Sequence, residues 1–125
     1  MARYFKLIIV MLIAVMASCQ EGREAGDLLG QWRMNGSDTH YISFSGSVVL
    51  FRCIGKGEVY GNFRHSGDSL FIDCHSIYGY PADTLLVEST FGMRPFENIR
   101  LRIDALDDDR LVLSQGERKW GWNRY

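Results

Sequence analysis

Three cysteines and three histidines are the side chains of this chain best suited to chemistry. Cys53, Cys74 and His40 fall near the ends of stretches with strand-like alternation, and they share the parity of the apolar residues there. Two thiolates and an imidazole form a donor set that zinc accepts. These residues lack the close spacing of a metal-binding motif, so we expect no metal site and no cofactor.

The third cysteine, Cys19, follows an apolar run at 7–16 that is preceded by the basic residues Arg3 and Lys6. This order is typical of a secretory signal peptide. The run is too short to span a bilayer as a helix, which takes about 20 residues. We therefore expect residues 1–18 to be a signal peptide.

The stretch Val15-Met16-Ala17-Ser18 before Cys19 resembles a bacterial lipobox. The resemblance implies cleavage before Cys19 and acyl chains such as palmitate on that residue. Two or three such chains hold a protein at a membrane where one is marginal. An ordinary secretory cleavage site is the alternative.

Residues 20–27 are polar and contain glycine, which is typical of a flexible tether. The chain thus divides into a signal peptide at 1–18, the lipidated Cys19 with a tether at 19–27, and one folded domain at 28–125. Gln20 differs from the Asp that retains many lipoproteins in the inner membrane. We expect an outer-membrane location in the cell envelope, with the periplasmic and the surface face both open.

The charge balance argues against nucleic acid as a partner. Without Arg3 and Lys6, 12 basic and 15 acidic side chains remain, a net charge of −3. Neither nucleic acid nor anionic lipid is attracted by such a surface.

Two cysteines left in an exported chain allow a disulfide. One further strand is expected between Cys53 and Cys74, which separates them by about 9.6 Å, twice the strand spacing. A disulfide needs Cα atoms within about 7 Å. A distorted rim would permit the bond, and buried free thiols are the alternative.

Catalytic motifs do not stand out in the sequence. We find no Gly-x-Ser-x-Gly, no His-Glu-x-x-His and no glycine-rich phosphate loop. The acidic run 107–109 fits a solvated hairpin turn rather than a calcium loop. We expect a protein that is not an enzyme.

Alternation of period two dominates the residues after the tether, and short polar or glycine-containing turns separate the runs. Short turns predict antiparallel neighbours. The predicted strands are 28–34, 39–45, 47–54, 58–65, 69–75, 98–105, 110–115 and 118–124. Eight strands with one apolar face each predict an all-β fold, an eight-stranded antiparallel up-and-down barrel.

Parity defines the residues that face into this barrel. They are Gly30, Trp32, Met34, Ile42, Phe44, Val49, Phe51, Cys53, Val59, Gly61, Phe63, Leu70, Ile72, Cys74, Ile99, Leu101, Ile103, Leu111, Leu113, Trp120 and Trp122.

Three motifs in order resemble the short lipocalin-like lipoproteins of Bacteroidetes. They are Gly30-Gln31-Trp32 on the first strand, the run 61–72 with its Gly-Asp-Ser-Leu-Phe-Ile, and the ending from 103 to Arg124. The resemblance implies a lipocalin-like barrel in which Arg124 stacks on Trp32, with Gly30 as the third structural residue. The domain is shorter than a full lipocalin, so its own side chains can fill the barrel in place of a ligand.

The connection at 76–97 is far longer than a hairpin loop and falls at the end of the barrel that is open in lipocalins. It is rich in aromatic and aliphatic residues, among them Tyr78, Tyr80 and Phe91. Residues 84–90 fit either a ninth strand or a short helical lid. The loop either fills the barrel with its own apolar side chains, or it controls the entry of a ligand or contacts a partner.

Two functions follow from this pattern. The first is a membrane-anchored lipocalin-like protein that binds a small apolar ligand inside the barrel. Its candidate ligand-binding residues are Trp32, Phe44, Phe51, Phe63, Tyr78, Tyr80, Phe91, Leu101, Trp120 and Trp122. The second is a solid barrel that contacts another envelope protein through the long loop, as an accessory subunit or inhibitor.

Overall fold

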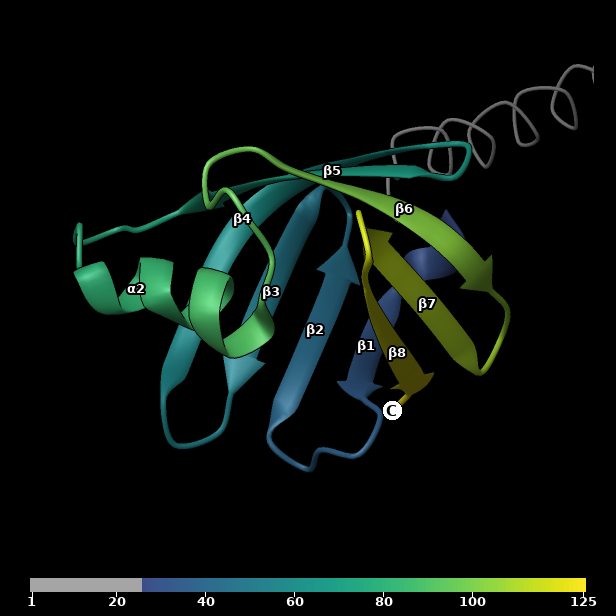
Figure 1. Ribbon diagram of the computed structural model, residues 1–125, viewed down its shortest axis with the longest axis horizontal. Helices are drawn as coiled ribbons and strands as arrows, with labels where there is room; N and C mark the ends of the chain where they lie inside the picture. Colours follow the sequence, from purple (N-terminus) through teal and green to yellow (C-terminus); the bar gives the residue numbers. More distant parts are fainter. Residues whose placement is uncertain (1–25) are drawn as a thin grey trace, which may run out of the picture.

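The computed structural model describes residues 26–125. The predicted signal peptide, the predicted lipidation site Cys19 and most of the predicted tether lie outside the described residues. The described part forms eight antiparallel strands that close into a barrel in chain order, with β8 beside β1 (Figure 1). The strands are β1 Gly30–Met34, β2 His40–Ser45, β3 Val48–Cys53, β4 Gly57–Ser66, β5 Ser69–His75, β6 Ile99–Leu106, β7 Arg110–Gln115 and β8 Arg118–Arg124. The predicted fold class is confirmed.

Tight turns join most neighbouring strands and set the up-and-down order. Gly46, Gly67 and Gly116 have φ of 59°, 59° and 61°, which two-residue hairpin turns require. The predicted first strand begins too early. Gly26–Leu28 instead form the single 3₁₀ turn η1, which places Leu28 in the core before the chain becomes extended at Gly30.

The core is one apolar cluster inside the barrel. On β6, Ile99, Leu101 and Ile103 are buried whereas the residues between them are exposed, as the alternation predicts. A register shift between Ile103 and Ala105 marks a β-bulge. Residues 26–125 thus contain the eight strands of the closed barrel together with this core cluster.

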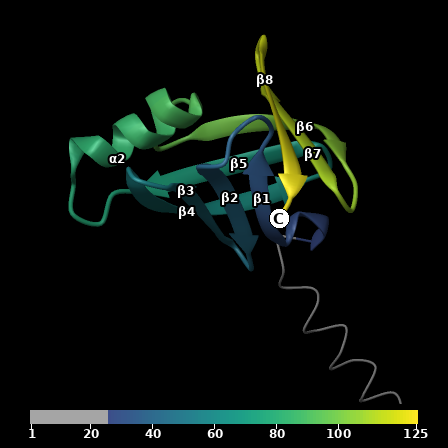
Figure 2. The same cartoon turned by 90° about the horizontal axis from the view of Figure 1, so that it is seen from below.

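The long connection between β5 and β6 is an insert, residues 76–98, with helical structure. It contains α2 at Pro81–Leu85 and the π-helical turn η2 at Leu86–Phe91, both of which pack next to β4 (Figures 1 and 2). Of the two structures predicted for 84–90, the helical one is correct. In the part of the chain that the structure describes, no helix has the length and apolar character to cross a membrane.

Candidate functional site

Most of the predicted lining residues meet inside the barrel. Because each lies at an inward position of its strand, their side chains converge on one space. Those that are buried there are Trp32, Phe44, Phe51, Phe63, Leu101 and Trp122. Trp120 is only partly buried and packs against the edge of the cluster.

Phe91 of the insert occupies the middle of this aromatic set. Its ring centroid lies 5.3 Å from that of Phe51, 6.2 Å from that of Trp122 and 5.2 Å from that of His40. The planes of Phe91 and Trp122 are nearly parallel, at 15°, whereas the other two contacts are edge to face. Phe91 is therefore the side chain through which the insert enters the barrel.

Other apolar residues of the insert complete the core. Leu86, Val87, Met93 and Phe96 are buried together with Phe91. In contrast, no residue of α2 is buried. Of the two roles left open for the long loop, the structure shows the insert filling the mouth of the barrel with its own side chains.

Polar contacts hold the end of the insert that follows η2. The Arg118 guanidinium donates a hydrogen bond of 2.9 Å to the carbonyl of Gly92. The Gln115 amide donates to the carbonyl of Arg94 and accepts from its N–H. The segment 86–91 before these contacts is seated mainly by its buried apolar side chains. The two parts of the insert thus differ in how they are attached.

Two tryptophans inside the barrel differ in their hydrogen bonding. Both are fully buried. Nε1 of Trp32 donates a hydrogen bond of 3.0 Å to the carbonyl of Leu28. Nε1 of Trp122 has no acceptor, and among the described residues it is the buried side-chain nitrogen or oxygen left without a partner. An unpaired donor in a core is unusual and costs free energy.

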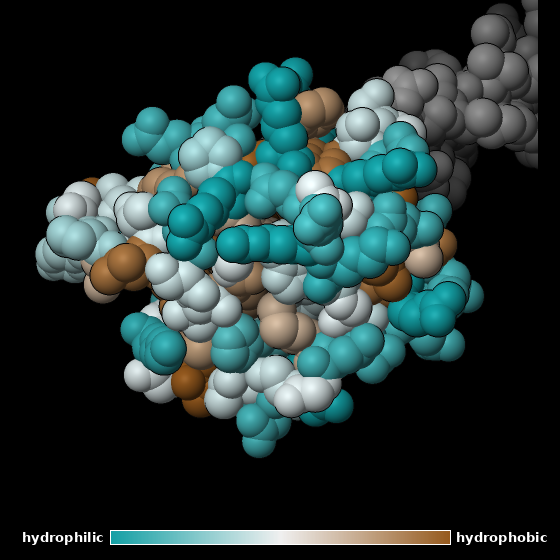
Figure 3. All heavy atoms as spheres, viewed as in Figure 1, coloured by the Kyte–Doolittle hydropathy of each residue, from teal (hydrophilic) through white to brown (hydrophobic). Residues whose placement is uncertain are grey.

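Tyr78 and Tyr80 are not part of this interior. Their side chains are 75% and 57% exposed, and their rings stack on each other with centroids 5.4 Å apart. The chain leaves β5 at His75 and projects away from the barrel before α2 begins, so these rings point outward. Figure 3 shows hydrophobic residues at the surface on the side of the molecule where the insert lies, among other places. Tyr78 and Tyr80 therefore lie outside the space that the strand aromatics share, and their role in ligand binding stays a prediction.

The closed end of the barrel is fixed by the three predicted structural residues. The guanidinium carbon of Arg124 lies 4.2 Å from the centre of the Trp32 ring, which confirms the predicted stacking. Arg124 also donates to the carbonyls of Leu29 and Asp27, at 2.6 and 3.0 Å. Gly30 has φ 121°, and a Cβ there would come within 3.0 Å of Arg124 Nη1. Glycine at this position therefore makes room for the arginine.

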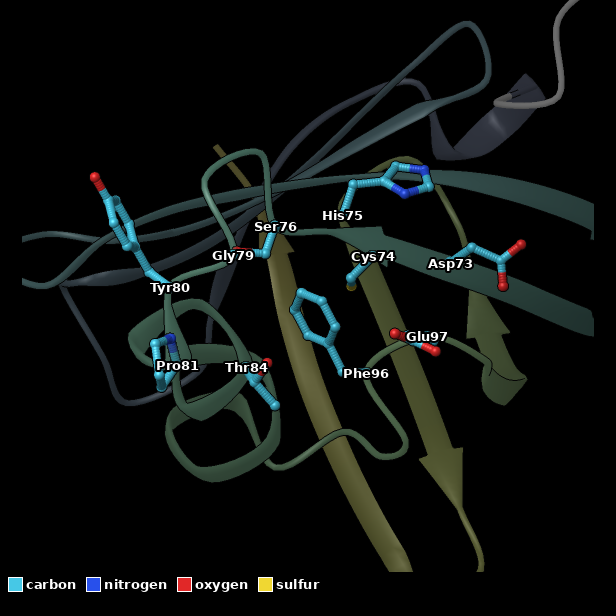
Figure 4. Close-up of a pocket in the computed structure, with 10 residues that line it drawn as sticks. All are labelled: Asp73, Cys74, His75, Ser76, Gly79, Tyr80, Pro81, Thr84, Phe96 and Glu97. Carbon is cyan, nitrogen blue, oxygen red and sulfur yellow. The ribbon is translucent and has the colours of Figure 1, made fainter.

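A groove of about 690 Å³ opens on the side of the barrel between the end of β5 and the start of β6. β5 and β6 pair only up to Ile72 and Ile99, and beyond that point the Cys74 N–H donates to the carbonyl of Phe96 at 3.1 Å. In Figure 4 the Phe96 ring lies between Cys74 and Thr84, and Tyr80 points away. The groove leads to two core side chains, and sequence reasoning missed it because it depends on where the strand pairing stops.

The two described cysteines are free and buried. β4 lies between their strands, as predicted, and burial together with the neighbouring Asp73 carboxylate raises the pKa of Cys74 to about 12. His40 Nδ1 lies 2.9 Å from the hydroxyls of both Ser37 and Thr39. Within residues 26–125, no three His, Cys, Asp or Glu side chains are grouped as a metal site requires.

Two solved structures share this fold. A lipocalin-like protein from Bacteroides uniformis matches with a TM-score of 0.66 and 17% identity over 79% of this chain and 99% of its own. An uncharacterized protein from Bacteroides eggerthii matches with a TM-score of 0.61 and 19% identity, over 78% of this chain and 98% of its own. No protein-family model and no curated protein sequence matches the chain. The likeness establishes a lipocalin-like fold.

Proposed function

We propose that this protein binds a small apolar ligand inside its barrel, and that the ligand takes the place of the insert's side chains. The observation that carries the proposal is Phe91, a ring from a separate helical segment that sits amid the aromatic residues of the strands. A space filled by a segment of the same chain becomes a binding site when that segment moves out.

The attachment of the insert favours such movement. Its helical part is seated by Leu86, Val87 and Phe91, whereas the hydrogen bonds with Arg118 and Gln115 are made at Gly92 and Arg94, after the helical part has ended. Apolar contacts are not directional, so an apolar ligand can replace them at little cost. Gly92 has φ 84°, and this left-handed residue separates the two parts.

The side groove offers a route to the interior. It is lined by Cys74 and Phe96, which both belong to the core cluster. The Phe96 N–H donates a hydrogen bond of 2.8 Å to the Glu88 carboxylate of η2. Displacement of η2 therefore also releases the residue that closes the groove.

We propose that Cys19 anchors this barrel to the outer membrane through acyl chains. The lipobox-like stretch 15–18 supports this assignment. A Cys19→Ala variant should leave the membrane fraction, and labelled palmitate should be incorporated into the wild type only.

Native mass spectrometry tests whether the protein carries a bound ligand. The chain beginning at Gln20 holds the whole closed barrel, and it is purified without detergent. We expect an extra mass that is lost on denaturation, or uptake of the added fluorescent probe N-phenyl-1-naphthylamine. A bare mass together with no probe uptake would refute the proposal.

One observation favours a second function, contact with another envelope protein. The insert exposes four large apolar side chains, Ile77, Tyr78, Tyr80 and Leu85, each by more than half. Deleting the insert is a poor test because Phe91 and its neighbours belong to the core. Serine at Ile77, Tyr78 and Tyr80 should instead leave the barrel folded while abolishing co-purification of a partner.

A further inference from the structure

We infer that the ligand of the barrel is an uncharged molecule with a hydrogen-bond acceptor, and that Trp122 Nε1 donates to this acceptor. This inference rests on the proposed function and adds the chemical class of the ligand. It starts from the unpaired indole N–H of Trp122, a fully buried side chain at an inward position of β8.

The position of Trp122 connects its donor to the insert. Its ring stacks on Phe91 at a centroid distance of 6.2 Å. When Phe91 withdraws, the space beside the indole passes to the ligand. Phe91 offers no lone pair to the N–H. Because the N–H points outward in the plane of the indole ring, a ligand that replaces Phe91 must extend to the edge of that ring to place an oxygen in line with Nε1.

Trp32 serves as an internal comparison. It is equally buried in the same core, and its Nε1 is satisfied by the Leu28 carbonyl at 3.0 Å. The fold thus supplies an acceptor to one indole of the barrel and none to the other. The unpaired N–H belongs to Trp122, the indole that contacts Phe91 of the insert.

The electrostatics of the interior favour an uncharged acceptor. Among the described residues, Ser114 is the buried polar side chain, and no lysine or arginine is buried with the core. The Arg124 guanidinium is engaged by the Trp32 ring and by the carbonyls of Leu29 and Asp27. The His40 ring is engaged with the rim hydroxyls of Ser37 and Thr39. An ionised carboxylate placed beside Trp122 would lack a counter-ion, and burial of an unpaired charge is strongly unfavourable.

A ketone, an ester or an ether meets these conditions. Each combines apolar surface for Phe51 and its neighbours with an oxygen that accepts one hydrogen bond. A plain hydrocarbon fills the space and leaves the N–H unpaired. A fatty acid in its ionised form satisfies the N–H but carries the charge into an apolar core.

Three eight-carbon probes separate these chemistries: 2-octanone, octanoate at pH 8 and octane. Binding is followed with ¹⁵N-labelled protein beginning at Gln20, through the indole N–H signals. We expect 2-octanone to shift the Trp122 signal downfield while the Trp32 signal stays in place. Octanoate and octane should bind about tenfold more weakly than the ketone.

The matched variant is Trp122→Phe, which keeps an aromatic ring and removes the donor. We expect its affinity for 2-octanone to fall about tenfold more than its affinity for octane does. The signal shift in the wild type needs no variant, so a Trp122→Phe chain that fails to fold leaves the inference testable.

The possible outcomes distinguish a failure of the inference about Trp122 from a failure of the proposed ligand binding. Equal binding of all three probes with an unmoved Trp122 signal overturns this inference and leaves the proposed function standing. Strongest binding by octanoate also overturns it, because the ligand would then be an anion. Failure of every probe to bind the wild type and Phe91→Ala overturns the proposed function and the inference with it.

Discussion

Replacing Phe91 by alanine distinguishes a detachable insert from an ordinary part of the core. Phe91 is 1% exposed and contacts Phe51, Trp122 and His40. In a core that unfolds as one unit, removing such a ring lowers the free energy of unfolding by about 3–5 kcal/mol. Phe44, which is also 1% exposed and contacts Phe63 away from the insert, is the matched control.

An insert that opens alone limits the loss. The substitution raises the free energy of the closed state. Once that free energy exceeds the free energy of the open state, the variant adopts the open state and its free energy of unfolding falls no further. A minor state populated at about 0.1–10% lies about 1.5–4 kcal/mol above the major one. Phe91→Ala should therefore lower the free energy of unfolding by less than Phe44→Ala does.

Urea unfolding and amide hydrogen exchange measure these quantities. Amides of 86–91 should exchange well before those of β4 in the wild type, because local opening needs less free energy than global unfolding. If about 1% of the wild type is open, Phe91→Ala should bind N-phenyl-1-naphthylamine up to about 100-fold more tightly. Equal losses for both variants, simultaneous exchange and unchanged probe affinity would show that the insert is permanent core.

Further predictions concern stability, pH and the exposed surface. Gly30→Ala should lower the free energy of unfolding by about 1–3 kcal/mol, measured in urea, because φ is 121° and the new Cβ meets Arg124. The raised pKa of Cys74, about 12 against an ordinary 9.0, favours the folded state fully below pH 9, and this contribution is lost as pH rises towards 12. The wild type should therefore lose more stability over that range than Cys74→Ala, and equal losses would contradict the shift. Serine at Tyr78 and Tyr80 should change neither the unfolding midpoint nor probe binding, since both rings are exposed; weaker probe binding would place them in the ligand site.

Regular alternation made the barrel predictable from the sequence. A half-buried strand repeats every two residues, so Ile99, Leu101 and Ile103 identify both a strand and its inner face. Glycines in the turns then define the order of the strands. The contact between Arg124 and Trp32 came instead from the resemblance to lipocalin-like lipoproteins, and the pairing of β1 with β8 brings the two residues together.

The arrangement of the insert was not predictable in the same way. Its apolar residues follow no single period, and π-helical turns depend on what they pack against. The outward Tyr78 and the inward Phe91 are both aromatic and lie in the same connection. Only the packing of η2 on the barrel decides which of them is buried. The unpaired state of Trp122 is likewise a property of neighbours distant in the chain.

A comparison of the two buried tryptophans tests, without any ligand, whether the Trp122 N–H is unpaired in the folded protein. Trp32→Phe removes a satisfied hydrogen bond and the ring on which Arg124 stacks, and it should lower the free energy of unfolding by about 1–3 kcal/mol. Trp122→Phe loses some apolar contact but also removes an unpaired buried donor, whose burial itself costs about 1–3 kcal/mol. The two effects oppose each other, so its unfolding free energy should stay within about 1 kcal/mol of the wild type. Equal destabilisation by both substitutions would mean that the Trp122 N–H is satisfied within the closed protein. A small change would mean that tryptophan at 122 adds little to the folded chain alone, which leaves the ligand as the reason for its indole N–H.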